Sequence, residues 1–282
     1  MTTPWQRFWF IAEPGASSLL PVRIGLSLIA AWYFASHWID AGKWFCEGGM
    51  LETKRLGEFL DAGDLGDAAK WRLSPLYLTS SMIVLRAYLL CGIALSVAAV
   101  MIRGSRLPAV LLWVWCIWLA NRSLLIAGPE ELALCFGLAY LTIPKPMDIA
   151  NPSDRGHWTE ALTRRLLQVH SVMLLALTGL TMLSSKVWWD GTGSISIAAP
   201  IGRRVFDLTN LLTSPWVHES ISHGIVFVAI AASILIWIPA TRFAAYLSLM
   251  IWCVVLALLS SQFMYLATVA ILLQCFRPEK RR

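Results

Sequence analysis

Charged residues are scarce in this 282-residue chain, in which Lys, Arg, Asp and Glu together make up 14%. Soluble domains contain about 25% of these residues. So few charged side chains cannot cover a water-facing surface, which argues against a soluble globular protein. Hydrophobic residues make up 57% of the chain, and 15 residues are Trp. Long apolar segments separated by Pro, Gly and charged residues predict an all-α integral membrane bundle, and the alternating pattern of a membrane β-barrel is missing.

Several sequence motifs are also missing, and each absence excludes a class of chemistry. The six cysteines form no C-x-x-C pair, so neither a disulfide framework nor a zinc site is predicted. Phosphate-binding glycine loops, dinucleotide fingerprints and paired-Asp metal motifs are missing, so no nucleotide or metal cofactor is required. The cations lie at the ends of apolar segments, and no basic patch for nucleic acid is indicated. The N-terminal "MTTPWQRFWFIAEPG" lacks the apolar core of a signal peptide, and residues 1–18 are interpreted as an interfacial segment.

Eight apolar segments are predicted to be membrane helices. They are residues 19–38, 83–102, 108–119, 132–143, 166–182, 225–238, 243–259 and 263–276. A full crossing needs about 20 residues, so 108–119, 132–143 and 263–276 either borrow flanking residues or are re-entrant. We predict eight crossings, with six crossings and two re-entrant segments as the alternative.

The two halves of the chain show the same order of features. The first half contains Arg23, Lys43, Glu47, Gly48, Ser74, Pro75, Arg103 and Pro144, and the second contains Arg165, Lys186, Asp190, Gly191, Ser214, Pro215, Arg242 and Pro278. The interval from the opening Arg to the Lys is 20 residues in the first half and 21 in the second. This order predicts two tandem four-helix repeats, residues 19–146 and 162–279, related by an axis along the membrane normal.

The distribution of Lys and Arg predicts the orientation of the chain. Cations are enriched in the short connections on one side, which is typical of cytoplasmic loops. Both termini are therefore expected in the cytoplasm. The two long loops, about residues 39–82 and 183–224, would then face outward.

Two K-x-x-x-[DE]-G motifs stand where apolar segments end. The first consists of Lys43, Glu47 and Gly48, and the second of Lys186, Asp190 and Gly191. On a helix, residues i and i+4 meet, so each Lys and its acidic partner are expected to form an ion pair. The glycine would end the helix, and neighbouring Trp residues would anchor it at the lipid headgroups. Both motifs would then be structural helix exits.

The second motif also permits a functional interpretation. A desolvated Lys186 with a lowered pKa would act as a base, assisted by Asp190, while Trp188 and Trp189 would form the walls of a site for a flat ligand. The sequence leaves both interpretations open.

Two histidines are further catalytic candidates. His170 is polar within a predicted span, where it would either be a hydrogen-bonded packing residue or handle protons. His218 would line the outward vestibule or cap a helix. The stretch "VHESISHG" departs from H-E-x-x-H because His223 comes one place too late, so no zinc protease is predicted.

Arg122 lies between two short predicted spans and is followed by Glu130 and Glu131. These charges would form either a structural ion-pair cluster or the anion-binding end of a ligand site that includes Arg122 and Glu130.

Two stretches of the chain resemble a known family. "QVHSVMLLALTGLTMLSSKVWWDGTG" and "WLANRSLLIAGPEELALCFGLAYLTIPKP" resemble the horizontally transferred transmembrane family, which includes the vitamin K-dependent γ-carboxylases. The resemblance implies a multi-span bundle whose outward face, in the carboxylases, oxidises a reduced quinone. Met182 occupies the position of the family's lysine, and no soluble domain follows to hold a peptide, so glutamate carboxylation is not expected.

Three functions remain open. We favour an accessory or structural subunit of a larger membrane complex, with other membrane subunits and the bilayer as partners. An enzyme acting on a quinone or a lipid, using Lys186, Asp190, His170 and His218, is the alternative. A lipid or small-molecule carrier is the third. The expected location is the bacterial cytoplasmic (inner) membrane.

Overall fold

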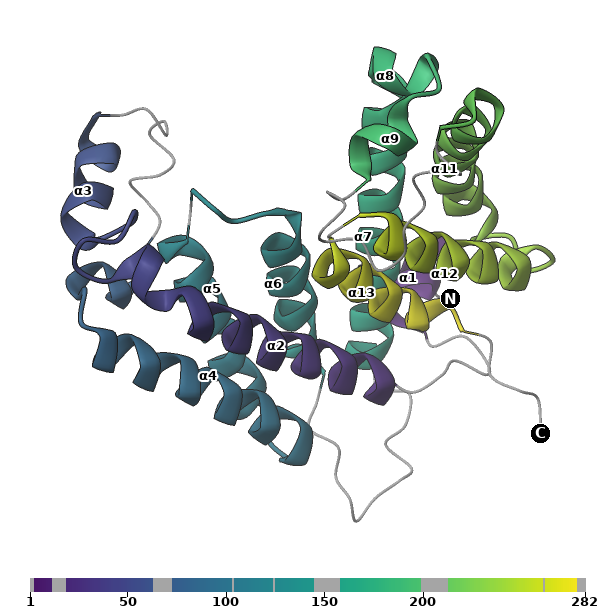
Figure 1. The fold of residues 1–282 in the computed structure, drawn as a ribbon. Helices are drawn as coiled ribbons and strands as arrows, with labels where there is room; N and C mark the ends of the chain where they lie inside the picture. Colours follow the sequence, from purple (N-terminus) through teal and green to yellow (C-terminus); the bar gives the residue numbers. More distant parts are fainter. Residues whose placement is uncertain are drawn as a thin grey trace. The chain divides into compact units, whose positions relative to one another are not determined.

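The computed structural model describes residues 3–11, 19–62, 73–102, 104–123, 125–144, 158–198, 213–260 and 262–277. All regular secondary structure in these ranges is helical, which confirms the predicted all-α class for this part of the chain (Figure 1). Four helices are long and apolar enough to cross a membrane, namely Met82–Met101, Trp158–Ser184, Pro215–Leu235 and Arg242–Leu259. These helices indicate an integral membrane protein. The chain divides into two compact units, a first unit of Arg23–Arg155 and a second unit of Met1–Val22 with Gly156–Arg282.

The first unit contains one long helix and three further helices that pack in series. Its elements are α2 (Leu20–Phe45), α3 (Thr53–Ala62), η2 (Pro75–Leu78), α4 (Met82–Met101), α5 (Leu107–Arg122) and α6 (Pro129–Leu141). Helix α4 packs on α5, and α5 packs on α6. Arg23 fixes α2 to the end of α4, because its Nε donates to the Ala99 carbonyl at 2.8 Å and its Nη2 donates to the Ile102 carbonyl at 3.2 Å.

The second unit contains α1 (Pro4–Phe10), α7 (Trp158–Ser184), α8 (Lys186–Trp189), α9 (Gly193–Ile197), α11 (Pro215–Leu235), α12 (Arg242–Leu259), α13 (Phe263–Leu272) and η5 (Leu273–Phe276). Helix α7 packs on α11, and α11 packs on α12. Gly179 permits close approach of the first pair, since a Cβ there would lie 2.7 Å from Ile230 Cγ1.

Helix α1 begins with a capping box and is held against α7 by Arg165. Thr3 and Gln6 exchange hydrogen bonds of 3.2 and 3.1 Å. Arg165 Nε donates to the Phe8 carbonyl at 3.0 Å, and its guanidinium lies 4.6 Å from the Phe8 ring centroid. Arg165 was expected to open a span but lies well inside α7 and is buried. Part of the predicted interfacial segment, residues 12–18, lies outside the described residues.

The pairs α4–α5 and α11–α12 bury side chains in the same register. In each pair a Trp indole donates to a main-chain carbonyl 27 residues earlier in the chain: Trp115 to Tyr88 at 3.0 Å, and Trp252 to Ile225 at 2.9 Å. With these residues as the guide, the buried positions of α4 match those of the α11 segment: Leu85 with Ser222, Tyr88 with Ile225, Leu89 with Val226, Gly92 with Ala229, Ser96 with Ser233 and Ala99 with Ile236. The two units therefore pack this helix pair alike.

Candidate functional site

The second K-x-x-x-[DE]-G motif forms a tight turn at one end of the second unit. Helix α7 ends at Ser184, and Lys186–Trp189 form the separate short helix α8. Gly191 has a φ of 73°, and its N–H donates to the Trp188 carbonyl at 3.3 Å. The Thr192 N–H donates to the Val187 carbonyl at 3.0 Å. These two bonds form a Schellman motif, which requires a left-handed residue at position 191 and therefore favours glycine.

Polar side chains of α11 hold this turn in place. His218 Nδ1 lies 2.9 Å from the Gly191 carbonyl, and Ser222 Oγ lies 2.7 Å from the same oxygen. A carbonyl oxygen can only accept, so Nδ1 of His218 carries a proton, and in the neutral ring Nε2 then keeps its lone pair. The buried Ser194 N–H donates to Ser222 Oγ at 2.8 Å. The hydroxyl and imidazole groups at this end thus satisfy main-chain groups.

Three predicted site residues of the second motif lie at this end of the unit with exposed side chains. They are Lys186, Asp190 and Trp189. Trp188 is instead buried against Gly193. Within the part of the chain that the structure describes, Lys186 and Asp190 do not form the expected ion pair, although the Asp190 N–H donates to the Lys186 carbonyl at 2.8 Å. The base hypothesis required a desolvated Lys186, but the described residues leave this side chain exposed.

His170 does not join this group. It lies 14 positions before Ser184, the last residue of α7. At 1.5 Å per residue, this separates it from the turn by about 21 Å along the helix axis. The structure therefore brings together Lys186, Asp190 and His218 and leaves His170 apart.

The first motif has the same glycine conformation but different partners. Gly48 has a φ of 76°. Lys43 pairs with Asp40 at 2.7 Å, so the expected ion pair with Glu47 is wrong. Helix α2 ends at Phe45, and Glu47 therefore lies beyond the helical geometry that would have placed it beside Lys43.

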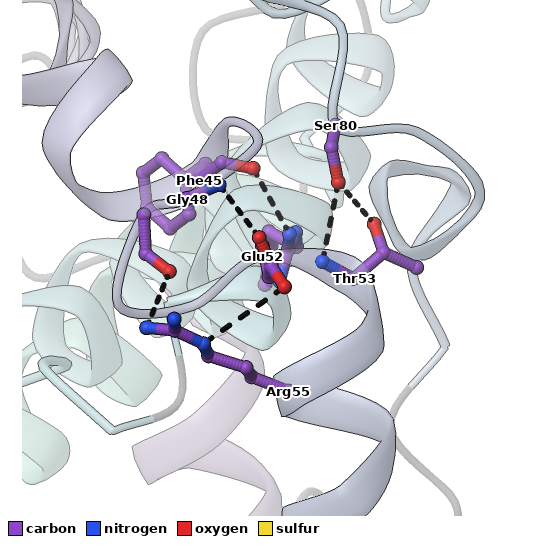
Figure 2. A network of polar contacts seen from close by, with 8 residues as sticks. Phe45, Gly48, Glu52, Thr53, Arg55 and Ser80 are labelled. Carbon is purple, nitrogen blue, oxygen red and sulfur yellow. Dashed lines mark hydrogen bonds and ion pairs between the residues drawn. The ribbon is translucent and has the colours of Figure 1, made fainter.

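Glu52, which the sequence did not single out, closes this turn. Its Oε2 accepts a hydrogen bond from the Gly48 N–H at 2.6 Å, and its other oxygen lies 3.8 Å from Arg55 Nε (Figure 2). Ser80 Oγ accepts from the Thr53 N–H at 3.2 Å, which fixes the start of α3. An acid four residues after the glycine was the only sequence signal for this arrangement.

Arg122 lies buried at the end of α5 in the first unit, with 1% of its surface exposed. Its Nη2 donates to the Phe45 carbonyl at 3.4 Å, and its guanidinium lies 5.5 Å from the Phe45 ring centroid. Its Nη1 has no hydrogen-bond partner among the described residues. The expected ion-pair cluster with Glu130 and Glu131 is therefore not formed within the described ranges.

Glu131 is the buried acid of this region and lies in the first turn of α6. Its carboxylate accepts a hydrogen bond from the Gly128 N–H at 2.7 Å. Burial, and secondarily the neighbouring Glu130, raise the pKa of Glu131 to about 7. Glu130 itself is only half-buried and belongs to no ion pair in the described ranges.

The raised pKa of Glu131 predicts a pH-dependent stability. The folded state binds the Glu131 proton more tightly than the unfolded state, so the stabilisation is complete below pH 4.5 and is lost as the pH rises through about 7. Between pH 5 and 8 the wild type should lose roughly 1 to 2 kcal/mol more unfolding free energy than Glu131→Gln, a discounted value because the group is partly solvated. Detergent-based unfolding at both pH values measures this difference. Glu58→Gln, on an exposed position of α3, should match the wild type, and an equal pH dependence in both variants would contradict the prediction.

No protein-family model, curated protein or solved structure matches the chain. Among the residues that the structure describes, no three His, Cys, Asp or Glu side chains gather as a metal site would require.

Proposed function

We propose that the chain is an accessory, structural subunit of a larger membrane complex and a divergent member of the horizontally transferred transmembrane family. The observation that carries this proposal is the set of hydrogen bonds that holds the turn of the second K-x-x-x-[DE]-G motif. His218 and Ser222 both reach the Gly191 carbonyl, and Ser222 also accepts from the Ser194 N–H. These groups fix a rigid, tryptophan-bearing end on the second unit, which is what a subunit interface needs.

We also propose that the chain consists of two tandem four-helix repeats, residues 19–146 and 162–279, with cytoplasmic termini. The equivalent indole-to-carbonyl bonds of Trp115 and Trp252 support this proposal. So do the left-handed glycines, Gly48 and Gly191, which follow Lys at the same spacing. Two of the features that suggested the repeat, Arg103 and Pro278, lie outside the described residues.

One observation favours the enzymatic alternative, a quinone- or lipid-directed activity at the same end. In the neutral ring, the proton on Nδ1 of His218 leaves Nε2 free to accept a proton. This ring lies against the turn that carries the exposed Lys186, Asp190 and Trp189. An imidazole held by a carbonyl in this way is oriented as a general base would be.

The subunit proposal predicts a specific contact at the rigid end. A photo-reactive residue placed at Trp216, which is 81% exposed in the first turn of α11, should cross-link one defined membrane protein in native membranes. The same residue placed at Ile238, just beyond the other end of α11, is the control and should not give that product. Purification in mild detergent should retain the cross-linked protein at a fixed ratio. A chain that always migrates alone and gives equal cross-links from both positions contradicts the proposal.

The enzymatic alternative is tested on the same preparation. Lys186→Met should leave partner binding intact if the chain is a subunit, because this side chain is exposed and takes no part in fixing the turn. Loss of turnover of a reduced quinone or lipid substrate in this variant, with the complex still assembled, would favour the enzyme instead.

A further inference from the structure

The first unit contains a buried guanidinium that has no counter-charge among the described residues. Arg122 has five N–H donors, yet its one hydrogen bond among the described residues is the long contact with the Phe45 carbonyl, and Nη1 is buried without a partner. The ion pairs within the described ranges are Lys43 with Asp40, Arg55 with Glu52 and Arg164 with Glu160, so Arg122 takes part in none of them.

The surroundings of Arg122 offset its charge only in part. Phe45 is the last residue of α2, and a helix C-terminus carries roughly half a negative elementary charge. The face of the Phe45 ring adds a weak attraction. A buried cation requires a partner with a full negative charge. A planar guanidinium matches the paired oxygens of a phosphate or carboxylate.

The fold does not require an arginine at this position. The register set by Trp115 and Trp252 aligns Arg122 with Leu259, which is buried at the end of α12 in the other unit. Preceding positions match as well, because Cys116 and Cys253 are both buried. An apolar residue therefore fills the equivalent place in the second unit. A residue that breaks the local packing rule without a partner in the fold indicates a functional site.

A second cation that forms no ion pair within the described ranges lies near the same turn. Arg86 is in the second turn of α4, is exposed, and lies 5.4 Å from the Trp38 ring centroid. Cys46 directly follows Phe45, and its Sγ lies 3.7 Å from Met82 Sδ, one helical turn before Arg86 on α4. Because α4 is long and apolar enough to cross a membrane, an arginine near its start is expected at the depth of the lipid headgroups.

We propose that Arg122, with Arg86 at its rim, forms an anion-binding site for the phosphate group of an anionic lipid. The phosphate takes the Nη1 donor that has no partner among the described residues, and Arg86 binds the same group from the membrane side. Entry of the phosphate displaces the Phe45 side chain, whose ring centroid lies 5.5 Å from the guanidinium carbon. The site is independent of the proposed subunit role.

Binding is tested on the full chain purified in detergent. Phosphatidylglycerol, phosphatidylcholine and inorganic phosphate are added separately, and the melting temperature is measured together with the lipid retained in native mass spectrometry. Phosphatidylglycerol at saturating concentration should raise the wild-type melting temperature by about 5 °C and leave one lipid bound, whereas phosphatidylcholine should do neither.

The matched variants are Arg122→Leu and Arg106→Leu, which remove one cation from opposite ends of α5. Arg122→Leu introduces the residue type found at the aligned position of the second unit, Leu259, so this variant should fold. It should lose both the rise in melting temperature with phosphatidylglycerol and the bound lipid. Arg106→Leu loses a contact with the Pro144 carbonyl but should keep both. Arg86→Gln should weaken binding about tenfold by removing the rim cation.

The outcomes separate the possible ligands. A full shift with inorganic phosphate alone supports the anion site but overturns the lipid as its ligand. An undiminished phosphatidylglycerol shift in Arg122→Leu overturns the site. If that variant does not fold, Arg122→Lys keeps the charge but removes the paired N–H donors of the guanidinium. Unchanged lipid retention in this variant would overturn the proposal equally.

Discussion

Gly191→Ala is expected to destabilise the protein by about 3 to 4 kcal/mol. Gly191 has a φ of 73°, a conformation that a residue with a Cβ adopts only with strain. A Cβ at this position would also meet the side chain of Glu219 and lie 3.0 Å from its Cα, which belongs to the rigid helix α11. The Gly191 carbonyl would then move away from His218 and Ser222, the two side chains that donate hydrogen bonds to it.

Gly48→Ala is the matched control for this substitution. Gly48 has nearly the same φ, 76°, but a Cβ there would have no heavy atom within 4 Å. Only the backbone strain remains, so this variant should lose about 1 to 2 kcal/mol. Denaturant unfolding of both variants in the same detergent measures the difference, and equal losses would show that docking of the turn on α11 contributes nothing to stability.

Much of the helical framework follows from the sequence, because apolar runs bounded by polar or helix-breaking residues are a local signal. The predicted span 83–102 is found as α4, Met82–Met101. The predicted span 19–38 is too short, because the helix continues to Phe45. Its last two turns contain Asp40 and Lys43, polar residues that suggested an exit but are compatible with a helix end at the headgroups.

The site was harder to predict because its contacts join distant residues. The i,i+4 rule presumes a continuous helix, yet α2 ends at Phe45, so Glu47 lies beyond the helix that carries Lys43. Lys186 and Asp190 do share a helical turn, but within the described ranges their exposed side chains form no ion pair. Ser222 reaches Gly191 across 31 residues of chain, and nothing local indicates that contact. The role of Arg122 also depends on burial, since its nearest acids in the sequence are not its partners in space within the described residues.

The proposed repeat has a second signal in the sequence, in addition to the spacing of its charged residues. "LWVWCIWLA" and "LMIWCVVLA", residues 112–120 and 249–257, share Trp-Cys and Leu-Ala at the same positions. In the structure the shared residues are the indole donors, a buried Cys and a buried Leu in each unit. The pair therefore aligns through its core, where packing limits substitution most strongly.

This alignment predicts how the two tryptophans contribute to stability. Trp252→Phe should cost about 2 to 3 kcal/mol, because it removes the hydrogen bond to the Ile225 carbonyl and leaves a cavity around a side chain that is only 4% exposed. Trp115→Phe should cost about 1 kcal/mol, since Trp115 is half-buried and its stacking on Tyr88, with ring centroids 4.7 Å apart, is retained by phenylalanine.

Thermal unfolding in detergent measures both losses, with Trp216→Phe as the control for an exposed indole. Each core variant should unfold below the control, because each breaks the same bond between equivalent helices. If only one of the two were destabilised, the shared register would be a coincidence of packing, and the proposed repeat would lose its strongest structural support. If both are destabilised in the expected order, the difference follows from burial alone, as two copies of one helix pair in unequal surroundings require.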